Sequence, residues 1–212
     1  MEEINHVVKA IKQSFRQMMD GSIAQSMRDK GVSYYLNWGA TIPRLKDKAD
    51  EIRVQFPTAD SQYSLAIALW KENVRECKIL ATMLMPADKI LPEVVDIWME
   101  QVPSQEIAEQ AAFNLWQHLP FAADKAFRWI ASEKEYEQLC GFHVLSRLMM
   151  KGQEPNERGI NEFLDQALAA LQGPYASVRK AAMQSVQRFA ELGLVYERLA
   201  KSALKSINLD FF

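Results

Sequence analysis

Carboxylate side chains gather near the middle of the chain, where they could carry out acid–base chemistry. They are Asp96, Glu100, Glu106 and Glu109. In helical spacing Asp96 and Glu100 share one face, and Gln105 and Glu109 share another. Paired carboxylates can transfer protons if they lie in a pocket, whereas on a solvated helix face they only keep that face polar. The sequence leaves both interpretations open.

Basic residues occur in short groups that could follow a phosphate backbone. Arginine and lysine on equivalent helices of a repeat can line one surface and contact phosphates there. A solvated face balanced by nearby glutamates is the alternative interpretation. The groups are Arg44, Lys46 and Lys48; Arg75 and Lys78; Arg179, Lys180 and Arg188; and Arg198, Lys201 and Lys205.

Metal and cofactor chemistry find little support in the residues. His6, His118 and His143 have no second histidine or cysteine at metal-ligand spacing, so we expect no metal and no cofactor. Cys77 and Cys140 lie in apolar helical stretches and are expected to be buried thiols rather than a disulfide. Motifs of serine hydrolases, P-loop proteins and dinucleotide-binding enzymes are absent from the sequence.

The overall charge limits how nucleic acid could be bound. The chain has 212 residues and a net charge of −2, with 49% hydrophobic and 25% charged residues. A nucleic-acid surface must therefore be a local strip rather than the whole exterior. The sequence contains neither an apolar run long enough for a membrane span nor a signal-peptide core at its N-terminus. We expect a cytoplasmic monomer with no membrane partner.

The elements that would position these side chains are helices. Pro86, Pro103 and Pro120 recur at equal spacing, and proline is tolerated best in the first turn of a helix. Apolar residues between them, such as Val95 and Trp98, recur at helical spacing and form one stripe per segment. Short helices with one apolar face stack on their neighbours, so we predict an all-α solenoid of antiparallel HEAT-like helix pairs with about ten helices.

We expect these helices to form a single domain over residues 1–212. Residues 1–38 would be N-terminal cap helices, residues 39–207 the repeats, and residues 208–212 an apolar tail that docks on the body. Asp60 or Ser61 is expected to cap the helix that contains Trp70.

Four sequence segments, in order, are similar to AlkD-like DNA alkylation repair proteins, which are HEAT-like repeat DNA glycosylases. The resemblance extends from about residue 20 to residue 192, and this chain would be a divergent member. It implies a right-handed superhelix that binds duplex DNA on its concave face. The segments are Gly39–Lys46; Leu65–Leu84 with Leu69-Trp70 and Arg75-Glu76; Arg128–Ser132; and Val178–Ala182.

The resemblance also implies which residues would act in catalysis. Active members excise cationic alkylated purines such as 3-methyladenine and 7-methylguanine. The family's tryptophan, and the aspartate four residues after it, match Gln105 and Glu109 here. Its arginine matches Leu139, and its second tryptophan matches Gln184. Breaking the glycosidic bond develops positive charge, which a carboxylate and aromatic faces stabilise. Of these groups only the Glu109 carboxylate remains, so we expect excision to be weak or absent.

We therefore predict a DNA-binding protein whose ligand is duplex DNA, alkylated or otherwise damaged DNA included. Two alternatives remain open. One is a protein-interaction scaffold that has lost DNA binding, which the net charge favours. The other is a glycosylase with a relocated site, using Glu109 or Glu106 and tryptophans such as Trp70 or Trp98. The predicted DNA contacts are Arg44, Lys46, Arg75, Lys78, Arg147, Arg179, Lys180 and Arg188, with Gln105 and Glu109 nearest a lesion.

Overall fold

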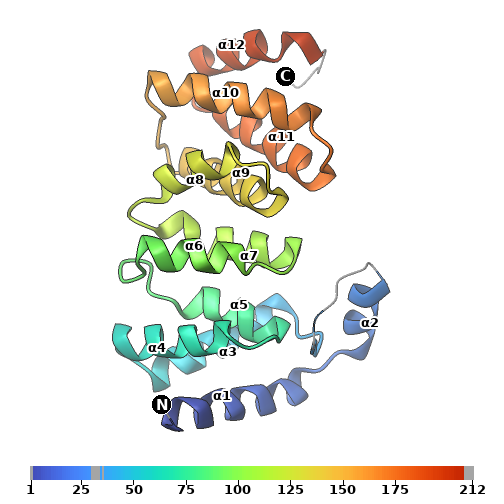
Figure 1. Cartoon of the computed structure of the whole chain (residues 1–212), viewed down its shortest axis with the longest axis vertical. Coiled ribbons are helices and arrows are strands. Elements are labelled where there is room, and N and C mark those ends of the chain that lie inside the picture. Colours follow the sequence, from blue (N-terminus) through green and yellow to red (C-terminus); the bar gives the residue numbers. More distant parts are fainter. Residues whose placement is uncertain (1, 30–33, 35, 208–212) are drawn as a thin grey trace. The chain divides into compact units, whose positions relative to one another are not determined.

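A computed structural model of the chain describes residues 2–29, 34 and 36–207. In this part of the chain the regular elements are α-helices and short 3-10 helices, without a β-strand, so the all-α prediction is confirmed. The α-helices are α1 (Glu2–Ser14), α2 (Gly21–Asp29), α3 (Ile42–Gln55), α4 (Ala59–Trp70), α5 (Arg75–Leu84), α6 (Pro92–Glu100), α7 (Gln105–Asn114), α8 (Ala122–Ile130), α9 (Glu135–Met150), α10 (Glu157–Gln172), α11 (Ala176–Ala190) and α12 (Leu194–Ala203) (Figure 1).

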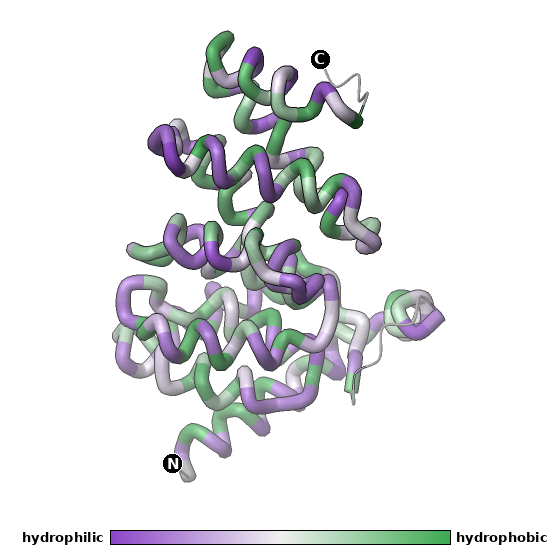
Figure 2. Tube along the Cα trace, turned by 45° about the horizontal axis from the view of Figure 1, so that its top comes forward, coloured by the Kyte–Doolittle hydropathy of each residue, from purple (hydrophilic) through white to green (hydrophobic). Residues whose placement is uncertain are grey.

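The apolar stripes read from the sequence form the buried faces of these helices. Val95 is 0% exposed and Trp98 is 3% exposed, both on α6. Hydrophobic and hydrophilic residues alternate around most helices, as expected for helices that are solvated on one face (Figure 2). The expected cap of α4 is wrong by two or three residues. Thr58 is the N-cap, because its hydroxyl accepts from the backbone N–H of Ser61 at 3.2 Å.

The chain divides into two compact units, Met1–Gln110 and Ala111–Phe212. In the first unit α1 packs on α4, and α5 packs on both α3 and α4. The indoles of Trp70 on α4 and Trp98 on α6 stack with ring centroids 4.2 Å apart. In the second unit α9 packs on both α8 and α11, and α10 packs on α8, α11 and α12. The single domain over residues 1–212 stays a prediction, and the expected tail at 208–212 lies outside the described residues.

A buried ionic network in the first unit anchors the segment before α3. The Arg75 guanidinium donates to both carboxylate oxygens of Glu106, at 2.8 and 2.6 Å, and to the carbonyl of Ala40 at 2.7 Å. The Glu76 carboxylate accepts from the backbone N–H groups of Trp38 and Ala40. These contacts join the 36–40 segment, α5 and the first turn of α7.

Tyr34 and Ser104 extend this network at the start of α7. The Tyr34 hydroxyl lies 2.6 Å from Ser104 Oγ and donates to Glu106 at 3.3 Å. Burial raises the pKa of Tyr34, so the hydroxyl keeps its proton. The Glu106 carboxylate therefore accepts hydrogen bonds from both Arg75 and Tyr34.

Gly141 allows α8 and α9 to cross closely in the second unit. A Cβ at this position would lie 2.7 Å from Ile130 Cγ2 and 2.8 Å from the Ala126 carbonyl. We expect Gly141→Ala to lower the free energy of unfolding by about 1–3 kcal/mol, because the crowding outweighs the gain in helix propensity. Gly21→Ala is the matched control, since nothing lies within 4 Å of its Cβ position. Equal urea midpoints for both variants would contradict this account of the crossing.

Candidate nucleic-acid interface

An aromatic and cationic cluster lies in the second unit, where the end of α7 meets α9. Arg147 Cζ lies 4.6 Å from the ring centroid of Phe113, a cation–π contact. The His143 ring meets Phe113 edge to face, with centroids 5.0 Å apart and planes at 69°. His143 and Arg147 are one turn apart on α9 and, like Phe113, are half-buried. The guanidinium is thus held in place while part of its surface remains in solvent.

Lys180 of α11 adds a second positive charge beside this cluster. Its charge, like that of Arg147, acts on the imidazole of His143. Neither the Arg147 guanidinium nor the Lys180 ammonium has a hydrogen-bond or carboxylate partner among the residues that the structure describes. Two cations that act on the same imidazole, neither of them in an ion pair with a carboxylate among the described residues, favour the binding of an anionic ligand. We call Phe113, His143, Arg147 and Lys180 the α9–α11 cluster.

The same surroundings keep His143 neutral. Burial lowers the pKa of His143 from 6.5 to about 4, and the positive charges of Arg147 and Lys180 act in the same direction. At neutral pH its imidazole therefore offers one N–H donor and one nitrogen acceptor.

The His143 shift predicts acid sensitivity. Below pH 6.5 the His143 imidazole binds a proton in the unfolded protein, whereas in the folded protein it does so only near pH 4. The folded state therefore loses stability over this pH range. We expect the free energy of unfolding to fall by about 1–3 kcal/mol from this residue, allowing for its partial exposure. His143→Gln should remove that part of the loss, as measured by urea unfolding at pH 7, 5.5 and 4.5. Parallel profiles for the two proteins would contradict the assignment.

The other predicted contacts of the second unit are already engaged. Arg179 donates to the carbonyl of Gly173 at 2.7 Å, and Arg188 pairs with Glu191 at 2.6 Å. Both are half-buried. Each would have to leave or share a partner in order to bind a phosphate, whereas Arg147 and Lys180 would not.

Two predicted contacts of the first unit lie on the exposed side of α3. Lys46 is exposed and has no ion-pair or hydrogen-bond partner among the described residues. Arg44 is exposed and donates to the carbonyl of Met18 at 3.3 Å. Arg44 also lines a shallow hollow with the carboxylates of Asp47 and Glu51, which weaken its field.

The structure does not support phosphate contacts by Arg75 and Lys78. Arg75 is 2% exposed and is held by Glu76, Glu106 and Ala40 in the buried network. Lys78 is 8% exposed, and its ammonium donates to the carbonyl of Trp70, the last residue of α4, at 2.8 Å. Burial lowers the pKa of Lys78. Both cations serve the packing of the first unit, because a helix C-terminus and buried carboxylates attract positive charge.

The positions that the resemblance matches to the family's catalytic residues have varied surroundings. Gln105 is exposed and donates to the half-buried Glu109 carboxylate at 2.8 Å on α7. Leu139 is 1% exposed, so this position belongs to the core. Gln184 is exposed on α11, one turn after Lys180. Hence the carboxylate remains accessible but is already hydrogen-bonded.

A site that uses Trp70 or Trp98 finds no support. These indoles are 2% and 3% exposed and stack on each other. Glu106, the other carboxylate considered for a relocated site, is engaged by Arg75. These groups therefore stabilise the first unit and are not open to a ligand.

Phe113 and His143 are the residues that sequence reasoning missed. From the sequence, His143 is considered only as a metal ligand and Phe113 is not singled out. The available signal was spacing, since His143 precedes Arg147 by four residues. The contact between Phe113 and His143 joins residues thirty positions apart in sequence, and no local sequence pattern reveals such a contact.

Comparisons with known proteins identify the family of this chain and a similar fold. The family model described as DNA alkylation repair enzyme matches residues 11–191. The chain therefore belongs to the DNA alkylation repair enzyme family, as its sequence motifs predicted. No curated protein sequence matches significantly.

One solved structure matches with a TM-score of 0.77 and 16% identity, covering 94% of this chain and 82% of the other. It is described as a new family of proteins related to the HEAT-like repeat DNA glycosylases with affinity for branched DNA structures. At this identity the match shows the fold, and the prediction of a HEAT-like repeat fold is confirmed.

Two kinds of feature are absent from the described residues. None of the helices there has the length and apolar character needed to cross a membrane. The same residues contain no group of three or more histidine, cysteine, aspartate or glutamate side chains that could hold a metal ion.

Proposed function

We propose that this protein binds DNA through the α9–α11 cluster and prefers branched DNA to a plain duplex. The observation that carries the proposal is that Arg147 and Lys180, on the packed helices α9 and α11, have no carboxylate partner among the described residues in a chain of net charge −2. Phosphates are the anions that such a local strip suits in a DNA repair family. The affinity of the structural neighbour for branched DNA supports the choice of ligand.

Excision of alkylated bases is a minor or absent activity in this proposal. The buried Leu139 supplies no positive charge where the family has arginine. Gln105 and Gln184 have no aromatic face with which to attract a cationic base. The Glu109 carboxylate accepts a hydrogen bond from Gln105, which lowers its capacity to stabilise a developing cation.

One titration series tests both parts. Labelled plain duplex, duplex containing 7-methylguanine and a three-way junction would be titrated at several salt concentrations, with released base measured in the same samples. We expect tightest binding to the junction, a steep loss of affinity with salt, and no release of base. Equal weak binding to all three DNAs, independent of salt, would instead favour a protein-interaction scaffold. Release of methylated base would contradict the absence of excision.

A further inference from the structure

The α9–α11 cluster contains groups that a site for phosphate alone would not need. Phosphate binding requires donors and positive charge, which Arg147 and Lys180 provide. The cluster also has the half-buried ring of Phe113 and the neutral imidazole of His143. Neither the Phe113 ring nor the neutral imidazole adds positive charge, and the ring and the acceptor nitrogen of the imidazole have no use in binding a phosphate.

Unpaired nucleobases match these additional groups. Proteins bind unpaired bases by stacking them on aromatic rings or on guanidinium planes, and by hydrogen bonds to the base edges. Arg147 is ordered by its contact with Phe113 at 4.6 Å, so its guanidinium is positioned before a ligand arrives. A neutral imidazole can both donate to and accept from a base edge, which a charged one does not.

We infer that Phe113, His143 and Arg147 form a binding site for an unpaired nucleobase at a DNA branch point, with Lys180 contacting the adjoining phosphate. This inference rests on the proposed function and specifies its ligand. It explains a preference for branched DNA, because a duplex has its bases stacked and paired whereas a branch point exposes unpaired ones. Plain duplex would use only the cations of the cluster.

The test compares two three-way junctions that differ only at the branch point. One carries two unpaired adenines, and the other carries two abasic tetrahydrofuran residues. We expect the wild-type protein to bind the base-bearing junction about tenfold more tightly. A 2-aminopurine placed at the unpaired position should change its fluorescence on binding.

Two aromatic variants locate the site. Phe113→Leu keeps the apolar volume but removes the ring, and should bind both junctions equally at the lower affinity. Phe127→Leu is the matched control, since Phe127 is also half-buried but lies on α8, and it should keep the wild-type difference. Circular dichroism would verify that both variants fold. If Phe113→Leu does not fold, the affinities of the wild-type protein for the two junctions still test the inference.

The outcomes separate the inference from the proposed function. Tight, salt-dependent binding without any difference between the two junctions would overturn the base site and keep DNA binding through phosphates. Absence of binding to either junction would overturn both. An equal loss of discrimination in Phe113→Leu and Phe127→Leu would place the base elsewhere and contradict the assignment.

Discussion

The double variant Arg147→Gln, Lys180→Gln is expected to lose most of its affinity for DNA. Each cation would make a charge-assisted contact worth about 1–2 kcal/mol, so affinity should fall about 30-fold or more. The slope of log affinity against log salt should become shallower by about 2, because two fewer counterions are released. Fluorescence anisotropy with a labelled junction, at four salt concentrations, measures both quantities.

A charge-matched control makes this result specific. Arg158→Gln on α10 combined with Lys201→Gln on α12 removes the same net charge from other exposed positions. We expect its affinity and salt slope to stay close to those of the wild type. If both double variants lost affinity equally, the effect would come from net charge, and the α9–α11 cluster would not be the interface.

The variant Arg75→Met is expected to cause the largest loss of stability. Removing the guanidinium leaves the carboxylates of Glu76 and Glu106 and the carbonyl of Ala40 without their cation. Breaking a buried ion pair on one side typically costs about 3–5 kcal/mol, because the remaining charge is buried and uncompensated. Urea unfolding followed by tryptophan fluorescence and circular dichroism would report the change.

Arg188→Met is the control for this prediction. Its pair with Glu191 is solvent-exposed, with side chains 42% and 59% exposed, so its loss should cost less than about 1 kcal/mol.

The salt slope of DNA binding by folded Arg75→Met should match that of the wild type. A slope shallower by about 1 would mean that Arg75 contacts phosphate after all.

The helices were predictable because their apolar residues repeat at helical spacing and proline or capping residues mark their ends. Val95 and Trp98 illustrate this, since both belong to one stripe and both are buried. The family motifs could also be recognised in the sequence, but the structural roles of their residues could not be predicted from it. Arg75-Glu76 resembles a surface pair in the sequence, and only the fold brings Glu106, thirty-one residues on, to the guanidinium.

The candidate interface was predictable only in part. The sequence predicts Arg147 and Lys180 as DNA contacts, and among the described residues neither side chain has a hydrogen-bond or carboxylate partner. Lys78 has the same charge and a similar helical setting, yet it is buried against the end of α4. Contacts between helices decide whether a cation is buried against the protein or remains accessible to a ligand. These contacts cannot be read from a single sequence.

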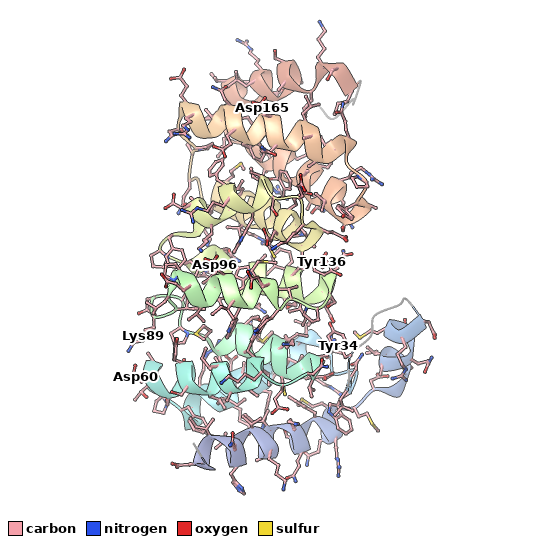
Figure 3. The ribbon with its side chains drawn as sticks, viewed as in Figure 1. Tyr34, Asp60, Lys89, Asp96, Tyr136 and Asp165 are labelled. Carbon is pink, nitrogen blue, oxygen red and sulfur yellow. The ribbon has the colours of Figure 1, made fainter. Side chains whose placement is uncertain are left out.

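Site-specific photocrosslinking tests the location of the interface most directly. A p-benzoylphenylalanine would replace Gln184, which is exposed on α11 one turn from Lys180, or Asp165, which is exposed on α10 (Figure 3). Each protein would be irradiated with a labelled three-way junction. We predict a DNA crosslink from position 184 and none from position 165. Crosslinks from position 165 alone, or equally from both positions, would contradict DNA binding by the α9–α11 cluster.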